Sequence, residues 1–600
     1  MPTRPDEPAP PPLGGGFLLA PVGSRRVRVP EDLDETQRAL LRTADRFAVD
    51  RVLANADRLE ARDLPLLRQL LLEAGELGLL GMEVPEAHGG LGLDAVSSLL
   101  VTEAMSRSGS WSATWSVHSG VGTLPIAWFG TEEQKRRWLP RLARGEAVAA
   151  YALSEAGSGS DALSARTRAV LSPDGRHWIL NGSKQWISNA ALADVFTVFA
   201  KIDGERFSAF LVEKGTPGFT VGKEERKMGL RGSSTCPLSF EDVRIPVDAL
   251  LGEAGKGHRI AFNVLNVGRL KLGASCVAGA RNVLQIAVQY ARGRKAFGQV
   301  IADFGLIREK LARMVILVYA GEAMIHRTAG AIDERTAASG TEPGTPAHAE
   351  ALVAAAEEYA AEASILKVWG SEALDWVADE ALQIHGGYGF VEEYAVERIY
   401  RDNRVNRIVE GTNEINRMLV PGTLLRRAMK GQYPWQELAA AVSEAVARGE
   451  PPRVAEGPLA RERRLAELNK YLAVYALQAA VEVLGPGIAE RQEVLGALAD
   501  GLIEAYALDS AVARALRSGG DGLAEACVQL FAVESHERAH AAARRAVRSA
   551  VPDAGACRTL LSGLGTLADE GPADLVSLRE RIVEATLRVG RHPFDTGERR

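Results

Sequence analysis

The chain has 600 residues, of which 46% are hydrophobic and 25% are charged. These ordinary values exclude a disordered, collagen-like or coiled-coil protein, and the length suits roughly four domains of about 150 residues each. The 71 basic and 77 acidic side chains give a formal net charge of -6. Nucleic-acid-binding proteins usually carry a basic surplus, so no nucleic-acid partner is expected.

The four cysteines are too far apart for a CxxC pair, which argues against a disulfide framework or a zinc ribbon. Histidine, cysteine and acidic residues form no cluster with metal-ligand spacing, so no metal site is expected. No uninterrupted apolar run reaches the roughly 18 residues needed to cross a bilayer. The proline- and glycine-rich start does not resemble a signal peptide, and a cytoplasmic protein is therefore expected.

Hydrophobic periodicity divides the chain into five segments. Residues 1–30 are expected to be flexible, and residues 31–150 to form a helical domain. Residues 151–255 carry short apolar runs and the turn dipeptides Asp174-Gly175, Asn181-Gly182 and Asp203-Gly204, which predict a β-domain. Helical periodicity returns over residues 256–430, with a helix–helix loop at 335–346, and again over 436–600, with a linker near residues 450–458.

This order predicts an α+β fold in which helices and strands are segregated along the chain. No GxGxxG sequence follows a strand and no GxxxxGK[ST] sequence occurs. A Rossmann site and a P-loop are therefore not supported.

Two segments near the start of the β-domain have the composition of ligand sites. YALSEAGSGSDA, residues 151–162, offers small residues whose exposed N–H groups can contact a phosphate or a heteroaromatic edge. NGSKQWISN, residues 181–189, places a tryptophan beside hydroxyl groups, which suits an aromatic cofactor with polar edge atoms. The structural alternatives are a connector into the β-domain and a tryptophan packed in its core.

Two later segments are also candidates. QIHGGYGF, residues 383–390, interrupts a helix with paired glycines, which either end the helix or admit a ligand. Glu410 follows the apolar residues Ile408 and Val409 at a glycine break. Apolar surroundings raise the pKa of a carboxyl group, as a general base requires. The alternative interpretation of Glu410 is an ordinary acidic residue at the surface.

The ordered set of motifs resembles the acyl-CoA dehydrogenase family over about residues 35–430. The motifs are YALSEAGSGSDA, NGSKQWISN, RKMGLRGSSTCPLSFEDVRIP, RGRKAFGQ, QIHGGYGF and RDNRVNRIVEGTNEI. The later segments LADGLIEAYALDSAVARALRS and HPFDTG are similar to the C-terminal domain of the very-long-chain branch. The resemblance implies an N-terminal helical domain, a middle β-barrel, a C-terminal four-helix bundle and an extra C-terminal helical domain.

The resemblance also implies FAD as the cofactor, held between the β-domain and the bundle, with its adenine end reaching the second subunit of a homodimer. Cofactor-binding residues implied by it are Leu153, Ser154, Ser160, Trp186, Ser188, Arg294, Phe297, Gln383, Gly386, Gly387, Thr412 and Glu414. Substrate-side residues implied by it are Ser160, Asn266, Arg269 and Gly411. Three departures from the family pattern, at Ala296, Phe304 and residues 155–157, concern details of the FAD contacts.

By the same resemblance, Glu410 is the catalytic base. It would remove the α-proton of a fatty acyl-CoA while a hydride passes from the β-carbon to flavin N5, giving the trans-2-enoyl-CoA of fatty-acid β-oxidation. Electrons would then pass to an electron-transferring flavoprotein. A backbone N–H at the base and a ribityl hydroxyl would polarise the thioester oxygen.

Two alternatives stay open at this point: an acyl-CoA oxidase, and a family member that serves as a non-catalytic assembly factor. A long-chain substrate is expected, mainly from the C-terminal resemblance. Gly120 and Gly122 would leave room for a long acyl chain, whereas Trp111 and Trp115 would close that space. Residues 436–468 are expected either to contact the inner membrane peripherally or to form an ordinary packed helix.

Overall fold

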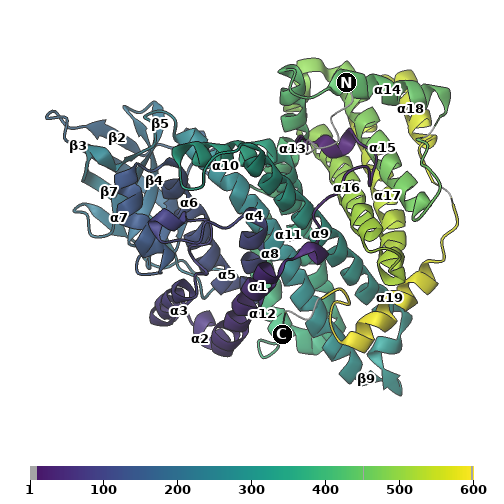
Figure 1. Cartoon of the computed structure of the whole chain (residues 1–600), viewed down its shortest axis with the longest axis horizontal. Coiled ribbons are helices and arrows are strands. Elements are labelled where there is room, and N and C mark those ends of the chain that lie inside the picture. The colour runs from purple at the N-terminus through teal and green to yellow at the C-terminus, as the bar shows by residue number, and fades with distance from the viewer. Residues whose placement is uncertain (1–9, 451, 570, 596–598, 600) are drawn as a thin grey trace.

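The computed structural model describes residues 10–450, 452–569, 571–595 and 599. An N-terminal helical block lies against a β-sheet on one side and a bundle of long helices on the other (Figure 1). The helices of this block lie between Glu35 and Ala143, within the segment expected to be helical over residues 31–150. Its helices are α1 (Glu35–Phe47), α2 (Ala56–Glu60), α3 (Leu64–Glu76), α4 (Ala95–Met105), α5 (Gly109–Ser116), α6 (Leu124–Phe129) and α7 (Glu132–Ala143).

The β-domain is one eight-stranded sheet with the order β6-β7-β3-β2-β4-β5-β8, in which β1 also pairs with β4. Its central strand β4 is buried on both faces, because Val195 and Phe199 join one hydrophobic core while Phe196 and Val198 join another. The strands are β1 (Ala149–Ala152), β2 (Arg168–Leu171), β3 (His177–Ser188), β4 (Val195–Ile202), β5 (Arg206–Glu213), β6 (Phe219–Val221), β7 (Thr235–Pro246) and β8 (Leu250–Leu251).

Two details of the β-domain differ from expectation. Pairing runs along an open path from β6 to β8, so the described strands form a sheet with two edges and the barrel is not confirmed. Asn181-Gly182 lies inside β3 at a register irregularity and makes no turn. Gly182 has φ +145°, and a Cβ there would lie 2.7 Å from Thr167 Oγ1, so the glycine permits close approach of neighbouring backbone. The other two dipeptides do form turns between strands.

The central bundle contains α8 (Gly257–Gly293), α9 (Gly305–Ala338), α10 (Pro346–Glu358), α11 (Ala360–His385), α12 (Ala395–Asn403) and α13 (Asn413–Met429). α8 packs along α9 and α11, and α11 packs against α13. The loop expected at residues 335–346 begins four residues later, after α9 ends at Ala338, and ends where α10 begins at Pro346. A short hairpin of β9 (Lys295–Ala296) and β10 (Gln299–Val300) follows α8.

The C-terminal extension is a second helical block that packs on the bundle through contacts of α16 with α9 and α13. It contains α14 (Trp435–Arg448), α15 (Ala460–Leu484), α16 (Gln492–Arg517), α17 (Gly522–Ala550), α18 (Ala554–Gly565) and α19 (Leu575–Val589). The span Ala460–Glu490 is long and apolar enough to cross a membrane by length and composition, contrary to the sequence expectation. Because α15 packs against α16 and α17, it lies here as an inner helix of the extension.

The N-terminal segment is docked, in contrast to the flexible segment expected over residues 1–30, of which residues 1–9 lie outside the described part. Phe17, Leu18, Val22 and Val29 are buried, and Phe17 packs on Tyr506 of α16 with ring centroids 4.9 Å apart. The segment crosses the bundle and the extension, and its apolar side chains gain partners that the local sequence does not reveal.

Candidate functional site

Glu410 lies in the short connection between α12 and α13. Its φ is +58° and that of Gly411 is +77°, so two successive residues adopt the left-handed conformation. Such backbone is uncommon for a residue other than glycine and is often found where a side chain must be aimed at a functional site. The Thr412 hydroxyl then caps α13 by accepting a hydrogen bond from Ile415 N at 3.3 Å.

Glu410 is half-buried, and its carboxyl oxygen Oε2 is buried without a hydrogen-bond partner in the described chain. Burial raises its pKa from 4.5 to about 7, although the positive charges of Arg269 and Lys367 act in the opposite direction. Gly268 makes room for this group, because a Cβ at Gly268 would lie only 2.7 Å from Glu410 Oε2. The outcome is a carboxyl group that exchanges a proton near neutral pH, as general-base catalysis requires.

The backbone of Glu410 is fixed by side chains from other elements. Arg269 of α8 donates from Nε to the Glu410 carbonyl at 3.1 Å and from Nη1 to Asn266 Oδ1 at 2.9 Å. Asn416 of α13 donates to the carbonyl oxygens of Glu410, Gly411 and Thr412 at 3.3, 2.9 and 3.0 Å. These bonds hold the strained turn and therefore the direction of the carboxyl group.

A cavity of about 1690 Å³ extends from Glu410 between the sheet, α8, α10 and α13. It brings together ten of the sequence-predicted residues, namely Leu153, Ser154, Ser160, Trp186, Ser188, Asn266, Arg269, Glu410, Gly411 and Thr412. Val117 and Val121 also line it, but Gly120, Gly122, Trp111 and Trp115 do not. The two tryptophans instead belong to the hydrophobic core of the helical block.

The sheet presents an aromatic and hydroxyl-bearing wall to this cavity. Trp186 has φ +58° at the irregularity in β3 and remains 57% exposed, so its indole ring faces open space and the core-tryptophan alternative is excluded. Ser154 and Ser188 lie beside it on the cavity wall. An exposed indole and free hydroxyls fit a planar heteroaromatic group with polar edges, as the isoalloxazine of FAD is.

A buried ion pair anchors this wall from behind. Lys184 Nζ donates to Glu155 Oε1 at 2.7 Å and to the Leu153 carbonyl at 3.1 Å. Glu155 also accepts from the backbone N–H groups of Arg166 and Thr167 at 2.6 and 3.1 Å. These contacts fix the backbone on which Leu153 and Ser154 stand.

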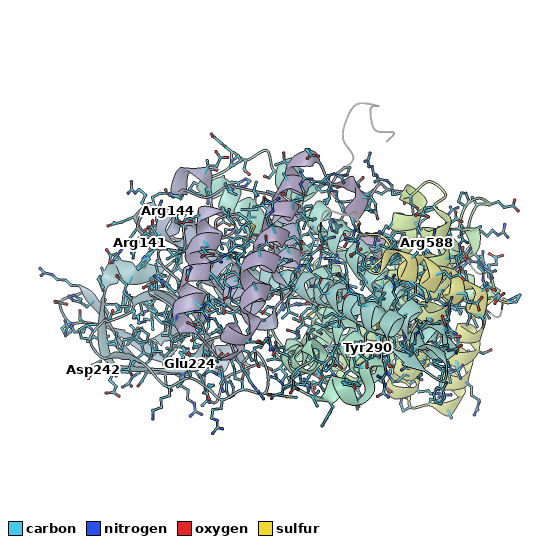
Figure 2. The ribbon with its side chains drawn as sticks, turned by 90° about the horizontal axis from the view of Figure 1, so that it is seen from below. Arg141, Arg144, Glu224, Asp242, Tyr290 and Arg588 are labelled. Atoms are coloured by element: carbon cyan, nitrogen blue, oxygen red, sulfur yellow. The ribbon has the colours of Figure 1, made fainter. Side chains whose placement is uncertain are left out.

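Five other predicted residues lie together at a second place, where α8 and α11 end. They are Arg294, Phe297, Gln383, Gly386 and Gly387, and Phe297 there is 97% exposed. Arg294 stacks its guanidinium 5.5 Å from the ring of Tyr388, and Tyr290 of α8 donates to the His385 carbonyl at 3.3 Å. Figure 2 shows Tyr290 in the same half of the molecule as Arg588 of α19, far from Asp242 of the sheet.

Open space surrounds the paired glycines at this place. A Cβ at Gly386 or Gly387 would meet nothing within 4 Å, so their backbone is accessible to a ligand or to another chain. Glu414 is exposed in the first turn of α13 and is not among the residues that line the cavity.

Sequence analysis missed three residues around Glu410. Gly268 lies in a helix where glycine has no local role, Lys367 is a buried lysine within α11, and Asn416 is an ordinary helical asparagine. The sequence holds a weak signal for two of them. A glycine inside a helix, such as Gly268, costs about 1 kcal/mol relative to alanine and therefore suggests a packing role. A lysine among core residues, such as Lys367, requires a partner.

Comparison with known proteins identifies the class. Family models match residues 34–146 (acyl-CoA dehydrogenase, N-terminal domain), 150–243 (middle domain), and 255–425 and 468–565 (C-terminal domains). The chain belongs to the acyl-CoA dehydrogenase family, whose members are FAD-dependent oxidoreductases.

Individual relatives cover from about three quarters to nearly all of the chain. A probable acyl-CoA dehydrogenase of Bacillus subtilis is 43% identical over 94% of this chain and 95% of its own length. The human very long-chain specific acyl-CoA dehydrogenase is 38% identical over 74% of this chain and 70% of its own, which confirms the similarity to the very-long-chain branch. The crystal structure of an acyl-CoA dehydrogenase complexed with FAD from Bacillus anthracis shares 44% identity and a TM-score of 0.94, covering 97% of this chain and 99% of that one.

Proposed function

We propose that this protein binds FAD and dehydrogenates long-chain fatty acyl-CoA to the trans-2-enoyl-CoA, with Glu410 as the base. The observation that carries this proposal is the buried Glu410 carboxyl group, which has a pKa raised to about 7 and borders a large cavity beside Trp186. When bound, FAD supplies the two-electron acceptor that protein side chains lack. Surface acids do not combine these features, and the surface-acid alternative for Glu410 is therefore excluded.

The chain's own residues account for the proton transfer. The thioester α-proton is only weakly acidic, so a base is useful only if it is ionised near neutral pH and directed at that carbon. Arg269 and Asn416 hold the Glu410 backbone, and Gly268 leaves the space into which its carboxyl group reaches. The enclosing walls exclude water, which strengthens the electrostatic interactions inside the cavity.

Several residues would bind FAD. In the cavity, FAD would be held by Leu153, Ser154, Ser160, Trp186, Ser188 and Thr412. The thioester would be flanked by Gly411 and Asn266. The adenine end of FAD would be held from a second subunit by Arg294, Phe297, Gln383, Gly386 and Gly387. The almost fully exposed Phe297 and the open glycine backbone support a homodimer that covers this place. The cofactor role of Glu414 stays a prediction, since this exposed side chain does not line the cavity of the single chain.

The test uses the purified, yellow, flavin-loaded protein under anaerobic conditions with saturated acyl-CoAs of graded length. Bleaching of the flavin should be fastest with long chains and should be lost in Glu410→Gln by roughly 10²–10⁴-fold. A variant that bleaches within tenfold of wild type would refute Glu410 as the base. Preference for short chains would refute the long-chain substrate alone.

Electron transfer and location require separate measurements. We propose an electron-transferring flavoprotein as the acceptor, in a cytoplasmic enzyme whose C-terminal extension contacts the inner membrane. Peroxide release in air at the rate of substrate turnover would instead indicate an acyl-CoA oxidase. Wild-type turnover that depends on Glu410 would exclude a purely non-catalytic assembly factor, and co-sedimentation with anionic vesicles tests the membrane contact.

A further inference from the structure

Arg417 joins the helix that follows Glu410 to the C-terminal extension. α13 packs against α16 (Figure 1), and Arg417 Nε donates to Asp500 Oδ1 of α16 at 2.7 Å. Its Nη1 and Nη2 donate to Glu372 Oε1 and Oε2 of α11 at 2.6 and 2.8 Å. Arg545 of α17 donates to the other carboxylate oxygen of Asp500. A bidentate guanidinium–carboxylate pair has a defined geometry, so carboxylates on α11 and α16 together fix the position of Arg417.

The carboxylate of Glu372 also holds the first residue of α13. Asn413 lies about one helical turn before Arg417, and its Nδ2 donates to Glu372 Oε1 at 3.0 Å. Asn413 Oδ1 accepts from Lys367 Nζ at 2.7 Å. Burial raises the pKa of Glu372, but the hydrogen bonds and charge of Arg417 outweigh it, so this pKa lies below its ordinary value and the group stays ionised. A carboxylate can only accept hydrogen bonds and an ammonium group can only donate them, so these two partners fix the direction of the Asn413 amide.

Asn413 in turn determines where the Lys367 ammonium group lies. Lys367 is fully buried, and within the described chain its Nζ donates to no other acceptor. Its positive charge favours the ionised form of Glu410, as does that of Arg269. The position of Lys367 therefore affects how readily the base gives up its proton.

Other charged and titratable groups also face Glu410 or Lys367. They are Arg269 and Cys276 of α8, Tyr151 of β1 and Glu414 of α13. Within the described chain, Lys367 alone among the groups facing Glu410 joins by side-chain hydrogen bonds to the series that begins at Asp500. We call this series the Asp500 network, and it consists of Asp500, Arg417, Glu372, Asn413 and Lys367.

We propose that Asp500 of the extension is a positioning residue for the reaction at Glu410. It acts through the Asp500 network, which holds the Lys367 ammonium group beside the Glu410 carboxyl group. Asp500 does not line the cavity, so it reaches the base only through its neighbours. The proposal rests on the proposed function, in which Glu410 is the base. On this proposal the C-terminal extension supports the catalytic site in addition to packing on the bundle.

Infrared difference spectroscopy of the flavin-loaded protein measures the ionisation of Glu410 without any turnover. The carbonyl band of its protonated carboxyl group, identified by its absence from Glu410→Gln, is followed as the pH is raised. In Asp500→Ala the midpoint should move to higher pH by roughly 0.4 to 1.5 units, because a displaced Lys367 ammonium group stabilises the carboxylate less. The pH midpoint of flavin reduction by acyl-CoA should move by the same amount. In a Lys367→Met background, Asp500→Ala should add no further shift, because the two residues act in series.

Glu534→Ala is the matched control. Glu534 of α17 pairs with Arg313 of α9 at 3.4 Å, which is another ion pair between the extension and the bundle. Its loss should leave the Glu410 midpoint unchanged. Glu372→Gln is a second test variant, which serves if Asp500→Ala does not fold, and it should shift the midpoint in the same direction as Asp500→Ala.

A merely structural role for Asp500 would lower the free energy of unfolding in Asp500→Ala and in Glu534→Ala and leave the Glu410 midpoint of both at the wild-type value. That result would overturn the proposal. An equal shift from Asp500→Ala with and without Lys367 would also overturn it, because the effect would then bypass the Asp500 network. Since the infrared midpoint requires no substrate, failure here is distinguishable from failure of the proposed reaction, which appears as flavin that acyl-CoA does not bleach.

Discussion

The raised pKa of Glu410 predicts how the reaction depends on pH. Burial shifts this pKa from 4.5 to about 7, which corresponds to about 3 kcal/mol of added cost for ionising the group. A base acts only when it is deprotonated, so the rate must rise with pH through the folded-state pKa. The ionised fraction grows from about one tenth at pH 6 to about nine tenths at pH 8, which predicts a roughly tenfold rise in rate.

Stopped-flow reduction of the flavin at low acyl-CoA concentration measures this profile, because it reports the free enzyme. Lys367→Met should move the midpoint to higher pH, since the Lys367 ammonium favours the Glu410 carboxylate. Lys223→Met, at an exposed lysine that does not line the cavity, is the matched control and should leave the midpoint unchanged. A flat profile between pH 6 and 8 would refute the role assigned to burial, and equal midpoints in Lys367→Met and wild type would refute the influence of the Lys367 charge.

Three substitutions test other parts of the structure. Gly268→Ala should retain the fold, as measured by circular dichroism. It should lower the rate of flavin reduction by at least about tenfold, because the added methyl group would displace the Glu410 carboxyl group. A rate equal to that of wild type would contradict that geometry. Lys184→Met should destabilise the protein by about 3–5 kcal/mol in denaturant unfolding by leaving Glu155 buried and unpaired, and Lys184→Met/Glu155→Gln should recover part of the loss. Gly15→Ala should lower the thermal midpoint, because Gly15 has φ +76° and its Cβ would lie 2.4 Å from a leucine methyl of α13; an unchanged midpoint would mean that the N-terminal segment adds no stability.

The sequence by itself predicted the order of the helical and β segments and a raised pKa for the Glu410 carboxyl group. Helical and strand periodicities depend on neighbouring residues, so the helical, β and helical segments could be recognised without any tertiary contact. Strands β2 to β8 fall within residues 151–255, whereas β1 begins two residues earlier, at Ala149. The glycine break after Glu410 likewise marked the turn where the left-handed backbone occurs.

Only the tertiary structure decided which distant residues meet. Arg269 and Glu410 are separated by 141 positions, and their contact depends on how α8 and α13 pack. The same holds for Gly268, whose missing side chain matters only because a carboxyl group arrives there from elsewhere in the chain. Residues 10–30 look flexible in sequence because proline and glycine offer no periodicity, yet they dock through contacts with α11 and α16. Local sequence encodes an element's own conformation, whereas its burial and the pKa of its side chains depend on neighbours that folding alone supplies.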